Sequence, residues 1–154
     1  MHRLMVLACL GVMAAPAAAT AQSAESDVMM VITGLFDGMR AGDSAAVRAA
    51  FAPDVRLMTA FERDGVPTLR AGSLEQFIAL VGSPHDDIWD ERIWGTEVRI
   101  DGRLATVWTN YAFYLGEKFS HCGVDAFQLF HGESGWQIVH LIDTRRTEGC
   151  TNDG

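Results

Sequence analysis

A change of hydrophobic period near residue 88 constrains the fold of this chain more than any other feature of its sequence. From Ile88 onward apolar and polar residues alternate, which is the two-residue period of a strand with two different faces. The alternation is interrupted at Asp101-Gly102, a strong hairpin signal, at Gly116-Glu117 and over residues 131–135. These breaks predict four long antiparallel strands over residues 94–100, 103–114, 119–130 and 136–145.

The first half of the chain has helical spacing instead. Three segments carry apolar residues at this spacing, over residues 28–39, 47–51 and 74–81. Residues that cap helices precede them, in the order Ser26 or Asp27, then Asp43, then the pair Ser73 and Gln76. Residues 55–61 and the segment that ends at Ala71 are extended. The elements predict an α+β fold in which a curved, mixed or antiparallel sheet wraps around about three helices, with a cavity between the layers.

The length and the net charge of the chain indicate its domain number and exclude two classes of partner. The chain has 154 residues, and 12 Lys and Arg against 20 Asp and Glu give a formal net charge of −8. The length fits one domain with its own core. Nucleic acids and anionic membranes require a basic surface, so neither is an expected partner.

The amino-terminal segment has the pattern of a secretory signal peptide. Arg3 precedes the apolar stretch Leu4–Ala15, and Ala19-Thr20-Ala21 is a small-residue cleavage site. A transmembrane anchor is the alternative, but this stretch is shorter than the about 20 residues that a bilayer requires. We expect cleavage after residue 21, a mature domain over residues 22–154, and a periplasmic or secreted location without membrane attachment.

The mature chain would keep two cysteines, Cys122 and Cys150. An even pair in an exported protein predicts one disulfide, and two buried thiols are the alternative. The sequence contains no C-x-x-C motif, so it gives no support to a redox centre or a zinc ribbon.

The turns assign the side chains of the last three strands to two faces. The assignment sets Ile100 opposite Arg103, Leu115 opposite Lys118 and Phe130 opposite Trp136, and a slip of one residue would exchange the faces. One face then mixes apolar and polar side chains, as a ligand cavity does. It carries Thr106, Trp108, Asn110, Ala112, His121, Asp125, Phe127, Leu129, Val139, Leu141, Asp143 and Arg145. The candidate ligand-binding residues are Trp108, Asn110, Phe127, Asp143 and Arg145.

Asp125 is the strongest candidate for chemistry on this face. The register places it between Trp108 and Leu141, where desolvation would raise the pKa of its carboxyl group and make it a proton donor. His121 is its candidate partner in proton exchange. Structural roles are the alternatives: a hydrogen-bonded histidine for His121, and an ion pair with Arg145 or Arg146 for Asp143.

The element order resembles the nuclear transport factor 2-like (NTF2-like) cone fold, the superfamily of ketosteroid isomerases, polyketide cyclases and scytalone dehydratases. The segments SHCGVDAF at residues 120–127 and GWQIVHLIDTRRTEGC at residues 135–150 resemble exported bacterial members grouped as lumazine-binding or polyketide-cyclase-like (SnoaL-like) proteins. The resemblance implies a pocket for a small molecule and no established reaction. Ketosteroid isomerases place an acidic residue on the strand that corresponds to the strand of Asp125.

Three functions remain open at this point. The leading hypothesis is binding of a small aromatic or heterocyclic molecule in the cavity. The second is acid/base catalysis of the isomerase, cyclase or dehydratase type by Asp125 and His121. The third is a structural module that forms a homodimer through the exposed face of the sheet, with Tyr111, Val124, Ile142 and Trp136 as candidates.

No cofactor or metal is expected. The sequence lacks a P-loop, a dinucleotide-binding fingerprint and a zinc-peptidase motif. The run His85-Asp86-Asp87, with Asp90 and Glu91 after it, is interpreted as a solvated acidic loop, because its spacing does not direct ligands inward.

Overall fold

Side chains cap two of the helices as predicted. A computed structural model describes the backbone of residues 17–150 and the side chains of residues 22–150. Its helices are α1 (Ala17–Ala41), α2 (Ser44–Ala50) and α3 (Leu74–Val81). Asp43 Oδ1 accepts hydrogen bonds of 3.0 Å from the backbone N–H groups of Ala45 and Ala46. Ser73 Oγ accepts one of 3.3 Å from the N–H of Gln76, so both caps satisfy free donors of a first turn.

Helix α1 begins earlier than predicted. We expected a cap at Ser26 or Asp27, but the helix runs through both residues from Ala17. Residues 17–24 are rich in alanine and contain neither Gly nor Pro, so the helix extends through them. At the other end the prediction is confirmed, because Gly42 adopts the left-handed conformation, with φ of +66°, that commonly ends a helix.

Six strands form one mixed sheet in the described part of the chain. They are β1 (Phe51–Arg63), β2 (Val66–Ala71), β3 (Trp89–Asp101), β4 (Leu104–Leu115), β5 (Lys118–Gly132) and β6 (Gly135–Arg145). Their order in the sheet is β2-β1-β6-β5-β4-β3. Strands β1 and β6 are parallel, and all other neighbours are antiparallel. The predicted α+β class and the four consecutive long strands are confirmed.

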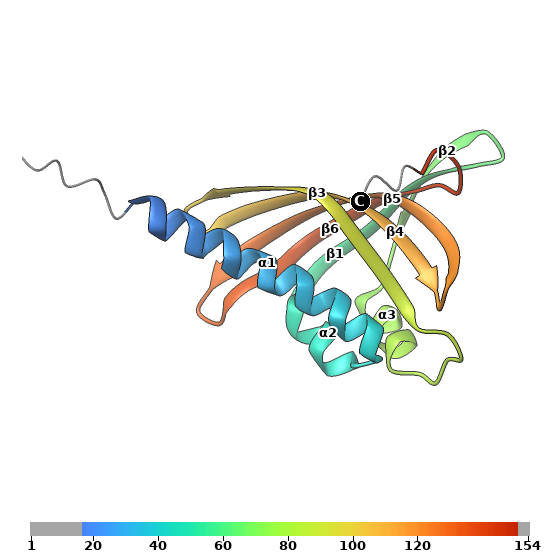
Figure 1. Cartoon of the computed structure of the whole chain (residues 1–154), viewed down its shortest axis with the longest axis horizontal. Helices are drawn as coiled ribbons and strands as arrows, with labels where there is room; N and C mark the ends of the chain where they lie inside the picture. Colours follow the sequence, from blue (N-terminus) through green and yellow to red (C-terminus); the bar gives the residue numbers. More distant parts are fainter. Residues whose placement is uncertain (1–16, 151–154) are drawn as a thin grey trace, which may run out of the picture.

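The helices lie together on one side of the sheet, with α1 along the strands and α2 and α3 near one end (Figure 1). The core fills the space between these layers. The helices contribute Val28, Ile32, Leu35, Phe36, Met39, Val47, Ala50, Ile78 and Val81, and the sheet contributes Ala105, Val107, Phe127, Leu129, Trp136 and Ile138. The opposite face of the sheet has no helix over it in the described structure.

Bulges change the predicted register of the sheet. Leu115 lies opposite Lys118 as predicted, but β5 then carries one extra residue, Ser120, between the pairs Tyr114–Phe119 and Phe113–His121. An extra residue exchanges the two faces of a strand relative to its neighbour. Beyond this bulge, therefore, the odd-numbered residues of β4 share a face with Asp125, whereas the even-numbered ones were expected to do so.

The strand β6 keeps its predicted face although its hairpin differs. Trp136 lies opposite His131, one residue beyond the expected Phe130. A second bulge at Val139 then adds another residue between Ile138 and His140. The two offsets together amount to two residues, so alternate side chains return to the expected face. The first hairpin is also offset, because Ile100 lies opposite Ala105 rather than Arg103.

The carboxyl end of the domain is tied to β5. Cys122 and Cys150 form the disulfide that the sequence predicted, with 5.9 Å between their Cα atoms. Residues 1–16 of the expected signal peptide lie outside the described residues. Within residues 17–150, none of the helices has the length and apolar character needed to cross a bilayer.

Candidate functional site

A cavity of about 560 Å³ lies between the helices and the inner face of the sheet. Its helical wall comes from α1 and α3, with Phe36 and Phe77 among the lining residues, and β1 contributes Leu57, Met58 and Thr59. The sheet contributes aromatic side chains and ionisable groups: Trp89, Glu91, Tyr111, Phe113, His121, Asp125, Asp143 and Arg145. Apolar walls with a few polar groups are typical of small-molecule sites.

Three carboxyl groups converge on this cavity from three strands. Asp125 on β5 and Asp143 on β6 are directly opposite each other across the two strands, and they are 3% and 9% exposed. Glu91 comes from β3 and lies within hydrogen-bonding reach of Asp125. Asp125 Oδ2 is fully buried and has no hydrogen-bond donor while both carboxyl groups are ionised. A proton on either group supplies the missing donor.

Burial determines the protonation of the Glu91–Asp125 pair. Desolvation is the largest cause that raises the pKa of Asp125 well above its ordinary value, and the negative charges of Glu91 and Asp143 raise it further. Desolvation also raises the pKa of Glu91 to about 7, against the hydrogen bond from Asp125 and the charge of Arg145. The pair therefore keeps a shared proton near neutral pH.

Tyr111 connects the carboxyl groups to the end of β6. Its Oη lies 2.9 Å from the backbone oxygen of Thr144 and 3.3 Å from Asp143 Oδ2, so the phenol donates to acceptors on β6. Burial raises the pKa of Tyr111 well above its usual range, which keeps this donor protonated. Arg145 Nη2 lies 3.5 Å from the same Asp143 oxygen and partly balances its charge.

Gly123 makes room for this arrangement. It lies opposite Tyr111 across β4 and β5. A Cβ atom at this position would lie 1.8 Å from the Thr144 oxygen and 2.9 Å from a ring carbon of Tyr111. Only glycine allows β6 and the tyrosine ring to approach β5 this closely.

His121 lines the cavity but is not suited to the predicted proton exchange. Its ring contacts Phe113 and Tyr111, with centroids 5.1 and 5.7 Å away. Its Nδ1 lies 3.0 Å from Ser120 Oγ. Desolvation, followed by the charge of Arg145, lowers the pKa of His121 to about 4, so the ring is neutral near pH 7. The group that titrates near neutrality beside Asp125 is Glu91.

The structure separates the predicted ligand-binding residues. Asp143 and Arg145 line the cavity with Asp125, whereas Trp108 is 52% exposed on the outer face. Asn110 lies on the same outer face and donates a 3.3 Å hydrogen bond to the Trp94 oxygen. Phe127 is buried in the core, edge-on to Phe36. Trp108, Asn110 and Phe127 therefore do not line this cavity, and their role in ligand binding stays a prediction. The Ser120 bulge explains the positions of Trp108 and Asn110, since it exchanges the faces of β4 relative to Asp125.

The bulges at Ser120 and Val139, with the offset of the last hairpin, change the neighbours of Asp125. Thr109 and Asp143 lie beside it in the sheet, in place of the expected Trp108 and Leu141. The proposed homodimer face changes as well, because Tyr111 and Trp136 are only 1% and 8% exposed and lie on the inner side.

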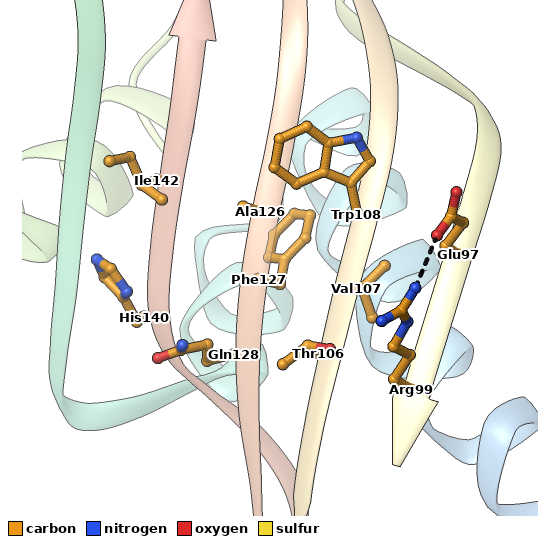
Figure 2. Close-up of a pocket in the computed structure, with 10 residues that line it drawn as sticks. All are labelled: Glu97, Arg99, Thr106, Val107, Trp108, Ala126, Phe127, Gln128, His140 and Ile142. Carbon is orange, nitrogen blue, oxygen red and sulfur yellow. Dashed lines mark ion pairs between the residues drawn. The ribbon is translucent and has the colours of Figure 1, made fainter.

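The outer face has a hollow of its own, with a volume of about 500 Å³ (Figure 2). In this view the helices lie behind the strands, and Trp108 and His140 project from the sheet on the near side. Glu97 and Arg99 of β3 form an ion pair of 3.7 Å at one edge. Leu104 and Phe130, each about half exposed, lie near it on β4 and β5. The homodimer stays a prediction: of its predicted residues Ile142 lines this hollow, and Leu104 and Phe130 are further exposed apolar groups.

Glu91 is the residue that sequence reasoning missed. It was assigned to a solvated acidic loop, but β3 begins at Trp89, and the two-residue period from Trp89 through Glu91 to Ile93 was the available signal. Asp90, the residue before it, forms an ion pair with Arg40 of α1. Within the described residues, no group of three or more His, Cys, Asp or Glu side chains has an arrangement that could hold a metal ion.

A family model described as "Putative lumazine-binding" matches residues 23–141. No curated protein matches the chain.

Solved structures share the fold at low sequence identity. An NTF2-like protein of unknown function from Shewanella baltica is 17% identical, with a TM-score of 0.64 over 83% of this chain and 97% of that one. An NTF2-like protein with a cystatin-like fold from Novosphingobium aromaticivorans is 13% identical, with a TM-score of 0.69 over 88% and 89%. One from Pseudomonas putida, also of unknown function, is 19% identical, with a TM-score of 0.62 over 80% and 87%. These likenesses establish the NTF2-like fold.

Proposed function

Because this chain belongs to the family described as "Putative lumazine-binding" and has an NTF2-like fold, we propose that it binds a small ring-shaped molecule in the cavity between sheet and helices. The cavity volume of about 560 Å³ lies within the range of about 300–1,000 Å³ that is common for ligand sites. Phe77, Trp89, Tyr111 and Phe113 supply aromatic surfaces for a planar ring.

The observation that carries this proposal is the buried carboxyl pair. A carboxylate without a hydrogen-bond partner costs free energy in a core, and proteins rarely keep one without a use. Asp125 Oδ2 is buried and depends on the proton shared with Glu91 for its hydrogen bond, and both residues line the cavity. A bound ligand with a suitable polar edge would satisfy it.

The binding proposal is tested by comparing two aromatic-to-alanine variants. A library of planar ring compounds is screened by thermal shift, and the dissociation constants of the hits are measured by calorimetry. F77A removes an aromatic wall of the cavity, and W108A removes an exposed ring on the outer face. We expect F77A to weaken binding and W108A to leave it unchanged. The reverse pattern would place the ligand in the outer hollow and refute the proposal.

Acid/base catalysis is the second candidate, because the Glu91–Asp125 pair holds a shared proton inside the cavity. Protonated Asp125 would donate to a ligand atom while the Glu91 carboxylate accepts a proton elsewhere on the ligand, as in an isomerisation without a cofactor. D125N keeps the size of the side chain but removes its acidic proton. Single-turnover conversion of a bound ligand should then fall about 10²- to 10⁴-fold. Conversion at the wild-type rate would reject this candidate.

We also propose that the protein acts outside the cytoplasm, in the periplasm or after secretion. The leader pattern at residues 1–21 and the Cys122–Cys150 disulfide support this location. Amino-terminal sequencing of the protein from its exporting host is expected to begin at Gln22. An intact Met1 on the product would contradict the proposal.

A further inference from the structure

We infer that the cavity selects a cationic ring with two adjacent N–H donors on one edge, an amidine or amino-azole type of ligand, which Asp125 and Glu91 hold. This inference rests on the proposed binding function and names the ligand class of that site. It follows from the charge balance of the cavity, from the orphaned oxygen of Asp125 and from the aromatic walls.

The carboxyl groups that line the cavity outnumber the protein cations that are available to pair with them. Glu91, Asp125 and Asp143 line it together with two arginines. Arg145 forms an ion pair with Asp143 at 3.5 Å, and Arg70 is exposed and lies over the Phe61 ring, 5.6 Å from its centroid. Among residues 22–150, no Lys or Arg forms an ion pair with Glu91 or Asp125. The cavity therefore has carboxyl groups that are matched by no protein cation.

A ligand that pairs with Asp125 and Glu91 must offer hydrogen-bond donors. Asp125 lines the cavity, and its buried Oδ2 has no hydrogen-bond donor once the proton that it shares with Glu91 is released. A carboxylate accepts two parallel N–H bonds from a planar cation, and such charge-assisted pairs are among the stronger hydrogen bonds of proteins. A ligand without a donor cannot take the place of the shared proton, and an anionic ligand is repelled by the charge that remains on the Glu91–Asp125 pair.

The aromatic residues of the cavity favour the same class. The Trp89 and Phe113 rings are edge-to-face, with centroids 6.1 Å apart, and both line the cavity beside Glu91. Faces of aromatic rings attract cations, and a delocalised planar cation also stacks on them. The carboxyl pair would bind the donor edge while these rings contact the faces of the ligand.

Three bicyclic probes of similar size test the inference by calorimetry on the full mature chain. Protonated 2-aminobenzimidazole has adjacent N–H donors, benzofuran has the same frame without a donor, and indole-2-carboxylate is an anion. We expect 2-aminobenzimidazole to bind at least about 10-fold more tightly than the other two, from one charge-assisted donor pair. Equal or tighter binding of benzofuran or of the carboxylate overturns the inference but leaves the proposed binding function standing. Failure of all three to bind also overturns the inference, whereas the proposed binding function fails only if the library screen gives no ligand that F77A weakens.

Matched variants identify the groups responsible. E91Q and D125N keep the size of each side chain and are expected to weaken binding of 2-aminobenzimidazole about 10- to 100-fold, while binding of benzofuran is unchanged. The controls are E97Q and D101N, the same substitutions on exposed parts of β3, and they should leave both affinities unaltered. A thermal melt of each variant establishes that it is folded. Wild-type affinity in folded D125N and E91Q would refute the role of the pair.

Discussion

Replacing Glu91 with Gln removes a carboxyl group whose pKa burial raises from 4.5 to about 7. Between these two pH values the folded chain holds a proton at Glu91 that the unfolded chain has already released. The free energy of unfolding supplied by this group is therefore present at low pH and is lost as the pH rises through 7. The shift corresponds to about 3 kcal/mol at most, because each unit is worth about 1.4 kcal/mol.

Two neighbouring groups contribute to the same pH range with different signs. The raised pKa of Asp125 acts in the same direction as that of Glu91. The lowered pKa of His121, about 4 against 6.5, acts in the opposite direction: the unfolded chain holds the extra proton, so stability rises as pH increases between these values. The opposite effects partly cancel in the wild-type pH profile. The difference between E91Q and wild type reports Glu91 together with its effect on the pKa of Asp125.

The assay is urea unfolding, followed by tryptophan fluorescence, at several pH values from 4.5 to 7.5. E91Q is expected to gain stability relative to wild type as the pH rises, by about 3 kcal/mol across this range. E97Q is the control, because its side chain is 68% exposed on the same strand, and its difference from wild type should not depend on pH. A difference for E91Q that stays constant, or that shrinks as the pH rises, would refute the shared-proton argument.

Three further changes test other parts of the structure. Replacing Cys122 and Cys150 together by Ser should lower the free energy of unfolding by about 3–4 kcal/mol, because the disulfide closes a loop of 28 positions; an unchanged urea midpoint would contradict this. G123A should cost about 3 kcal/mol or more, since its Cβ would overlap the Thr144 oxygen, whereas G34A, in open space on α1, should stabilise the protein by about 0.5–1 kcal/mol. Equal urea midpoints for the two glycine variants would show that the close approach at β5 is misjudged.

Much of the fold could be predicted because its signals are local. Gly102 and Gly116 have φ of +57° and +58° in the hairpins that were recognised from their sequence. Asp43 and Ser73 cap helices because a short polar side chain before an apolar run has few other roles. The placement of Asp125 in the cavity followed from the same period-two reasoning on β5.

The composition of the site could be predicted only in part, because it depends on pairings between distant segments. No glycine or proline at Ser120 indicates the bulge in the sequence. The bulge nevertheless determines which residues of β4 share a face with Asp125. A similar irregularity in β3 does have a signal, Gly95 with φ of +62°, since a glycine inside a strand often indicates a bulge. Glu91 was missed because its strand begins directly after a Pro- and Asp-containing loop.

The bulge at Ser120 determines which residues of β5 share a face with which residues of β4. Every residue of β5 beyond it meets the cavity or the solvent according to whether the count from the hairpin is odd or even. Deleting this one residue, without altering any carboxyl group, would exchange the partners of Asp125 on β4 and set it against Trp108. In a sheet of this kind, the insertion or deletion of one residue in a strand can therefore change the residues of a binding site more completely than a substitution within the site.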